Sequence, residues 1–154
     1  MPTSSFDERL VLGANTERSW EVLIDVPRLV GWVSIVDDAV EIRRLEKYTA
    51  VLLDRLGPFR LRADLDIDVD EVEIGRHVHI RANGEDRQVA SRISVDGELS
   101  LEPTDTGGTV LSIRATYEVS GRVATMGAGM IRKKADTLVR EFLENADAAL
   151  GSVA

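Results

Sequence analysis

The chain of 154 residues contains no cysteine, which excludes a disulfide framework and thiolate chemistry and is typical of the reducing cytoplasm. No stretch approaches the ~18 consecutive apolar residues of a membrane-spanning helix. The N-terminus also lacks the basic region and following apolar region of a signal peptide. We therefore expect a cytoplasmic protein without a transmembrane segment.

Positive charge is also scarce, because 19 Lys and Arg residues stand against 27 Asp and Glu residues and leave a net charge of −8. Nucleic-acid and anionic-lipid partners both require clustered basic residues, so neither is expected. Nucleophile, phosphate-loop and dinucleotide-binding motifs are missing too. The absence of these motifs therefore predicts no catalytic residue, no cofactor and no metal.

What the chain does contain is the composition of one globular domain, with 44% apolar and 30% charged residues. We expect a single domain spanning residues 1–154. Its dominant segment is residues 121–150, where apolar residues recur at helical spacing and predict a long amphipathic helix. The apolar face comprises Ala124, Gly127, Ala128, Ile131, Ala135, Leu138, Phe142, Ala146 and Ala149. Gly127 and Gly129 weaken such a helix, so they predict either close approach to a sheet or room for a ligand.

Strands are predicted where apolar and polar residues alternate, most clearly over residues 59–70. If Leu56 pairs with Phe59 across the Gly57-Pro58 turn, then Leu52 faces inward, and so does the carboxyl group of Asp54. Further strands are expected over residues 5–12, 77–82, 88–101 and 109–120, and Asn83-Gly84 indicates a hairpin turn. Two short helices, carrying Trp20 and Trp32, follow the first strand.

This order predicts an α+β fold, in which a curved antiparallel sheet of about seven strands wraps around the long C-terminal helix. Each strand offers one apolar face, and only the last helix is long enough to cover so wide a sheet. The burial of its apolar face makes that helix essential to the fold.

Several motifs resemble the family of the G subunit of carbon monoxide dehydrogenase. They are Gly108-Thr109, residues 117–124 (YEVSGRVA) leading into the long helix, Leu56-Gly57-Pro58-Phe59, and the early Trp20, Leu23 and Asp25. That family belongs to the START-like helix-grip superfamily, also called SRPBCC or polyketide cyclase/dehydrase and lipid transport. The resemblance implies a β-α-α-β6-α cup with an apolar cavity, a quinone-like or lipid-like ligand, and an accessory role toward molybdenum hydroxylases.

Longer family members carry a C-terminal extension that ends in a hydrophobic anchor, whereas this sequence stops four residues after Leu150. We accordingly expect membrane contact to be peripheral at most.

Candidate chemistry outside the cup is sparse. His77 and His79 share one strand face, and pairing of Asp70 with His77 and of Asp68 with His79 would allow a metal site. Neighbouring opposite charges on a solvated sheet surface explain the same residues, and this is the interpretation we adopt.

We therefore predict a non-enzymatic carrier of one hydrophobic small molecule, held between the sheet and the last helix. The predicted cavity residues are Trp20, Trp32, Leu52, Phe59, Leu61, Ala63, Tyr117, Gly127 and Ile131, with the two tryptophans near the entrance. One alternative is a cyclase-like or hydratase-like enzyme using Tyr117 or Asp54. Another is an assembly factor that acts through its surface.

Overall fold

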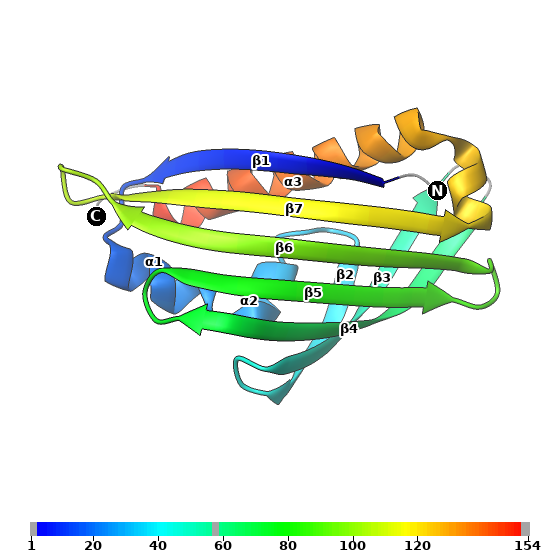
Figure 1. Cartoon of the computed structure of the whole chain (residues 1–154), viewed down its shortest axis with the longest axis horizontal. Coiled ribbons are helices and arrows are strands. Elements are labelled where there is room, and N and C mark those ends of the chain that lie inside the picture. Colours follow the sequence, from blue (N-terminus) through cyan, green and yellow to red (C-terminus); the bar gives the residue numbers. More distant parts are fainter. Residues whose placement is uncertain (1–2, 57–58, 152–154) are drawn as a thin grey trace.

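The computed structural model describes residues 3–56 and 59–151, which form a seven-stranded antiparallel sheet, two short helices and a long C-terminal helix (Figure 1). The sheet curves, and α3 runs along its concave side. The elements in chain order are β1 (Thr3–Leu12), α1 (Thr16–Leu23), α2 (Val26–Val30), β2 (Val36–Arg43), β3 (Lys47–Leu56), β4 (Phe59–Glu73), β5 (His77–Asp86), β6 (Ser91–Pro103), β7 (Thr109–Gly121), the 3-10 helix η1 (Arg122–Met126) and α3 (Ala128–Leu150).

The strands lie in the order β1-β7-β6-β5-β4-β3-β2, so β2 to β7 form a meander and β1 closes against β7. Leu56 pairs with Phe59, which confirms the predicted register of β3 and β4; the intervening turn, residues 57–58, lies outside the described residues. Side chains of β4 alternate between buried and exposed from Leu61 to Asp70, and those of β7 do so from Thr109 to Val119. One face of the sheet is therefore apolar along its whole width.

The predicted hairpin turn at Asn83-Gly84 was wrong, because the turn between β5 and β6 lies later in the chain. β5 continues to Asp86, and the turn occupies residues 87–90. The Asp86 carboxylate fixes this turn by accepting hydrogen bonds from the backbone N–H groups of Gln88 and Val89, at 2.9 and 3.2 Å. Gly84 is needed inside the strand, because a Cβ there would lie 2.5 Å from Cδ2 of Leu65.

The predicted helix over residues 121–150 is interrupted at Gly127. η1 ends at Met126, and Gly127 then adopts φ 96° before α3 begins. Close approach to the sheet does not account for these glycines, because a Cβ at Gly127 or Gly129 would meet no atom within 4 Å and both residues are exposed. The positive φ of Gly127 accounts for that residue, since side-chain-bearing residues rarely adopt it. No packing reason distinguishes Gly129.

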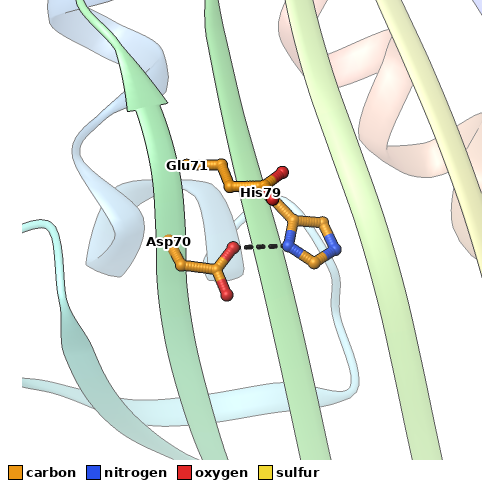
Figure 2. A group of neighbouring side chains, drawn as sticks. All are labelled: Asp70, Glu71 and His79. Carbon is orange, nitrogen blue, oxygen red and sulfur yellow. Dashed lines mark hydrogen bonds and ion pairs between the residues drawn. The ribbon is translucent and has the colours of Figure 1, made fainter.

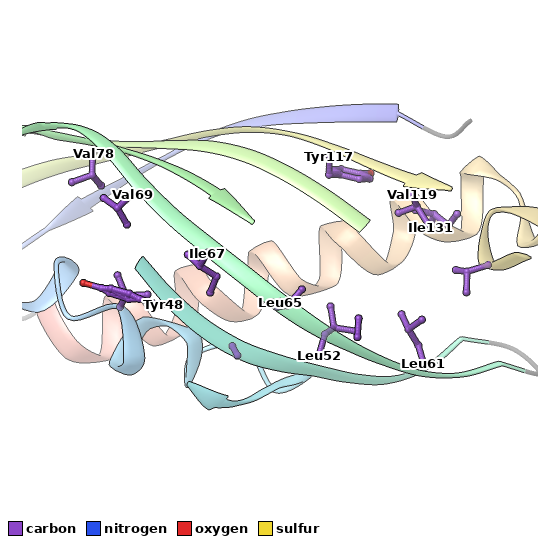
Figure 3. Close-up of a cluster of buried hydrophobic side chains, with 14 residues drawn as sticks. Tyr48, Leu52, Leu61, Leu65, Ile67, Val69, Val78, Tyr117, Val119 and Ile131 are labelled. Carbon is purple, nitrogen blue, oxygen red and sulfur yellow. The ribbon is translucent and has the colours of Figure 1, made fainter. Parts of the chain in front are cut away.

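The core consists of two clusters of buried apolar side chains, and both pack against the partly buried Phe6, Trp20 and Leu99. The larger cluster joins β3, β4 and β7 to Val123 of η1 and Ile131 of α3. Figure 3 labels Ile131 among the residues of this cluster. The smaller one joins β1, α1 and the end of β6 to Ala146 and Leu150 of α3. The backbone N–H of Ala14 donates to the Leu150 carbonyl at 2.9 Å and fixes the end of α3. None of the helices within the described ranges is long and apolar enough to cross a membrane.

Candidate functional site

A cavity of about 400 Å³ lies between the concave face of the sheet and α3. Its wall is built from apolar side chains of almost every element. The strands contribute Phe6, Val36, Leu52, Leu61, Leu65, Ile67, Ile80, Ala82, Ile93, Val95, Leu99, Ile113, Ala115 and Val119. α2 and the segment after it contribute Val26, Leu29, Val33 and Ile35, and η1 and α3 contribute Val123, Ile131, Ala135, Leu138, Val139 and Phe142.

Small residues at the centre of the wall explain why the space is not filled by side chains. On the sheet, Gly97 of β6 pairs with Ala115 of β7, and both line the cavity, as does Ala82 of β5. Ala135 is the small residue that α3 contributes. A Cβ on Gly97 would reach the Cβ of Ala115 at 3.6 Å, an ordinary contact, so the backbone geometry does not require glycine there. The hollow therefore follows from short side chains on both sides.

Four of the residues predicted for the cavity lie on its wall: Leu52, Leu61, Tyr117 and Ile131. Figure 3 shows how they are distributed, with Tyr117 on one side of the cup, Leu52 and Leu61 on the other, and Ile131 on α3. All four are less than a tenth exposed. Ala63 is 1% exposed, but it belongs to the larger core cluster rather than to the cavity wall.

The two tryptophans are set back from the cavity. Trp32 packs edge-on against Phe142, a wall residue, with ring centroids 5.4 Å apart. Trp20 is partly buried between the two core clusters. Gly127 is exposed and is not among the residues of the cavity wall. It is the N-cap of α3, which starts one residue later. Phe59 begins β4, and its side chain lies outside the described residues.

An ion pair interrupts the apolar wall. Nζ of Lys134 lies 3.2 Å from Oδ1 of Asp54, whose side chain is 9% exposed. Both residues line the cavity, as do the polar residues Tyr117 and Glu98. The sequence had indicated that the Asp54 carboxylate faces inward, but its partner was missed because Lys134 stands among the charged residues of α3. Its spacing of three residues from Ile131, one helical turn, is the signal that places it on the same face.

Two further polar contacts hold α3 against the segment between α2 and β2. The Glu141 carboxylate accepts hydrogen bonds from the backbone N–H and from the hydroxyl of Ser34, the latter at 3.0 Å. Nδ2 of Asn145 donates to the carbonyl oxygen of Trp32 at 2.9 Å. Lys134, Glu141 and Asn145 thus attach one side of α3, which borders the cavity, to other elements of the fold.

The histidine cluster lies on the other face of the sheet. Asp70 pairs with His79 instead of with His77, because the turn between β4 and β5 lies at residues 74–76, later than the predicted pairing requires. A bulge between Asp70 and Glu73, with Glu71 at φ 47°, then shifts the register by one residue. Nδ1 of His79 lies 2.5 Å from Asp70, the contact drawn in Figure 2. Its Nε2 lies 2.5 Å from Asp96.

This geometry favours a charged histidine over a metal ligand. Asp70, Glu71 and His79 do bring three potential ligand atoms within 4.8 Å of one another. However, a metal-binding imidazole must offer a deprotonated nitrogen, and both nitrogens of His79 face carboxylates. The hydrogen bond to Asp96, then the one to Asp70, raise the pKa of His79 above its usual value, and burial opposes them only in part. The cluster is best described as an ion-paired imidazolium.

Comparison with solved structures identifies the fold. A conserved protein from Geobacillus kaustophilus superposes with a TM-score of 0.82 at 23% identity, covering 95% of this chain and 94% of its own. A START superfamily protein from Mycobacterium smegmatis superposes with a TM-score of 0.66 at 10% identity, covering 94% of this chain and 98% of its own.

The two-domain aromatase/cyclase StfQ of the steffimycin biosynthetic pathway also superposes, with a TM-score of 0.66 at 13% identity. It covers 95% of this chain and 50% of its own. At these identities the similarity shows the START-like fold alone. No curated protein matches the sequence.

The family is shown by the sequence match, which extends over residues 12–151 and so includes every element from the end of β1 to α3. The chain belongs to the CoxG family, described as the G subunit of carbon monoxide dehydrogenase.

Proposed function

We propose that the protein binds one hydrophobic small molecule in the cavity between the sheet and α3, without transforming it. The observation that carries this proposal is the cavity itself, about 400 Å³ in volume and lined almost entirely by apolar side chains. Binding sites for small ligands are commonly 300 to 1,000 Å³ and combine an apolar wall with a few polar groups. This wall has that composition, with Tyr117, Asp54 and Lys134 as polar groups.

The proposed ligand is quinone-like or lipid-like, and Leu52, Leu61, Tyr117 and Ile131 contact it. Burial of its apolar surface would provide most of the affinity, at roughly 25 cal/mol per Å² before the costs of association. The Tyr117 hydroxyl would donate a hydrogen bond to a carbonyl of the ligand. Replacement of Tyr117 by Phe tests that bond: affinity for a quinone is expected to fall about tenfold, and unchanged affinity would show that the hydroxyl makes no such contact.

Binding can be measured through the tryptophans. Trp32 contacts Phe142, which lines the cavity, so a quinone inside the cavity is expected to quench part of the tryptophan emission. Titration with decylubiquinone should give a saturable decrease with one site per chain. A decrease that never saturates would indicate collisional quenching and would refute the proposal.

A matched pair of variants locates the site. Ala135→Phe adds a phenyl ring inside the cavity and is expected to abolish saturable quenching, because Ala135 lines the wall. Ala149→Phe makes the same change on the same helix at an exposed position, and the affinity should stay at the wild-type value. Equal affinities in both variants would place the quinone elsewhere. Chemical conversion of a ligand bound in the cavity would indicate an enzyme.

The family supports a second part of the proposal, that the protein is an accessory of a molybdenum hydroxylase of the carbon monoxide dehydrogenase type. We expect tagged protein mixed with such an enzyme to elute with its subunits in size-exclusion chromatography. Separate elution at micromolar concentrations would refute this part and leave ligand binding untouched.

A further inference from the structure

The boundary of the cavity differs in structure from one side to another. Among the residues that the structure describes, nearly all that line the cavity belong to a strand, to α2, to η1 or to α3. Val33 and Ile35 are the exceptions, because residues 31–35 between α2 and β2 form neither helix nor strand. Ser34, which stands between them, is exposed and is not a lining residue. Residues 31–35 therefore separate the cavity from the solvent by a single layer of residues.

The contacts that join this segment to α3 are mostly polar. The Glu141 carboxylate accepts hydrogen bonds from the backbone N–H and from the hydroxyl of Ser34, and both bonds are exposed. Nδ2 of Asn145 donates to the carbonyl oxygen of Trp32, and the Trp32 ring packs edge-on against Phe142. Water competes for exposed hydrogen bonds, so these contacts stabilise the closed arrangement only weakly.

The other borders of the cavity are held more firmly. The strands of the sheet are hydrogen-bonded to their neighbours across its whole width. α3 is fixed at its N-terminal end by the buried Ile131 and at its C-terminal end by the buried Ala146 and Leu150. The Leu150 carbonyl also accepts the backbone N–H of Ala14. Opening at any of these borders would break buried contacts.

The segment itself is anchored at both of its ends. Leu29, which precedes it in α2, is 5% exposed. At the other end, the carbonyl oxygen of Ile35 accepts the backbone N–H of Leu53 of β3 at 2.7 Å. Local opening of a protein takes place where few buried contacts must be broken. Residues 31–34 meet that condition, because they can move away from α3 while both anchors and the helix stay in place.

We propose that residues 31–35 form a gate segment: a ligand enters and leaves the cavity between this segment and α3, and Glu141 holds the gate closed through its hydrogen bonds to Ser34. This inference rests on the proposed ligand-binding function and concerns access to its site. The same contacts hold the gate segment in the empty and in the occupied protein. Glu141 therefore controls the rates of association and dissociation together and leaves the affinity nearly unchanged.

The absence of cysteine from the chain allows the gate segment to be fixed chemically. In the double variant Ser34→Cys/Glu141→Cys, 1,2-ethanediyl bismethanethiosulfonate bridges the two thiols, and dithiothreitol removes the bridge. Mass spectrometry confirms the bridge, and stopped-flow tryptophan quenching with decylubiquinone measures both rate constants. Before bridging, loss of the hydrogen bonds should raise both rate constants about tenfold above wild type. After bridging, both should fall about tenfold or more below wild type, and dithiothreitol should restore the fast rates.

Arg18→Cys/Glu21→Cys is the matched control, because these residues form an exposed ion pair within α1 at 3.7 Å and neither lines the cavity. The same bridge there should leave both rate constants at their wild-type values. Wild-type rates in the bridged gate variant would overturn the inference, since the ligand would then enter by another route. A wild-type protein that does not bind decylubiquinone would instead refute the proposed function.

Single substitutions on α3 test the role of Glu141 without a bridge. Glu141→Ala removes the acceptor of both Ser34 hydrogen bonds and should raise the two rate constants together by about tenfold, so that their ratio, the dissociation constant, stays at the wild-type value. Glu144→Ala is the control, because Glu144 is exposed on the same helix and should leave both rates unchanged. Equal rates in the two variants would overturn the assignment of Glu141 to the gate.

Discussion

The ion-paired histidine on the outer face of the sheet allows a prediction about stability and pH. His79 lies on β5 between Asp70 of β4 and Asp96 of β6, with both imidazole nitrogens 2.5 Å from carboxylate oxygens. Its side chain is 9% exposed, whereas those of Asp70 and Asp96 are 46% and 54% exposed. His79→Gln removes the positive charge and leaves two carboxylates near each other.

The magnitude follows from these exposures. A hydrogen bond between charged groups contributes about 1.5 to 3 kcal/mol when shielded from water. Exposed ion pairs contribute only about 0.2 to 1 kcal/mol. Because His79 is buried while both carboxylates are half exposed, each contact should lie between these limits. We expect the substitution to lower the free energy of unfolding by about 2 kcal/mol at pH 6.

The direction of the pH dependence is fixed by the sign of the pKa shift. The pKa of His79 is raised in the folded protein, chiefly by the hydrogen bonds to Asp96 and Asp70. Its contribution is therefore fully present below the unfolded pKa of about 6.5 and is lost as the pH rises through the folded pKa. The difference in stability between wild type and His79→Gln should thus be larger at pH 6 than at pH 9.

Urea unfolding of both proteins at the two pH values measures this difference. His77→Gln is the matched control, since Nδ1 of His77 contacts the Ser100 hydroxyl at 2.9 Å. Its effect on stability should be small at both pH values. A stability difference for His79→Gln that is the same at pH 6 and pH 9 would refute the interpretation of His79 as an imidazolium.

Two other predictions concern the approach to α3. Gly129→Ala should raise the free energy of unfolding by about 0.5 kcal/mol, because a Cβ there meets nothing and the substitution restricts the unfolded chain. Gly127→Ala should lower the free energy of unfolding by about 1 kcal/mol, because φ is 96° at that position. Thermal unfolding measures both variants, and shifts of the unfolding temperature with the same sign would contradict this reasoning. Ser91→Ala should cost about 1 to 3 kcal/mol, since the buried Ser91 hydroxyl accepts the backbone N–H of Val123 at 3.0 Å. Ser94→Ala is the control for Ser91, and an equal loss in both variants would show that the contact to Val123 is unimportant.

The segments with regular spacing of apolar residues predicted the fold, because in them the polarity of each residue indicates whether its side chain faces the core or the solvent. The Leu56–Phe59 pairing, once assumed from the turn, placed the inward residues of β3 and β4 correctly. The predictions were wrong where the role of a residue depends on its contacts with another strand and not on the local sequence pattern. Gly84 looks like a turn glycine, yet it makes room for Leu65 inside a strand. The turn at residues 74–76 and the bulge between Asp70 and Glu73 together place Asp70 opposite His79, and the alternation of residue types indicates neither of them.

The candidate site was less predictable than the fold. Hydrophobic periodicity shows which side chains face the interior, but not whether they meet there. Gly97, Ala115 and Ala135 all line the cavity, but they come from β6, β7 and α3, which are separate elements of the chain. The ion pair of Asp54 with Lys134 likewise joins β3 to α3. Such pairings are properties of the assembled cup: the spacing of Lys134 from Ile131 indicates its face of α3, but not the strand residue that it contacts.

The order of the strands also governs how the chain can be synthesised and folded. β2 to β7 can pair in succession as each hairpin leaves the ribosome, since every one of these strands adjoins its predecessor. β1 precedes the other strands but pairs with β7, and α3 follows β7, so the growing sheet has an uncovered apolar face until α3 has been made. The nascent chain therefore exposes that apolar face until α3 has been synthesised, and exposed apolar surface of this kind favours aggregation.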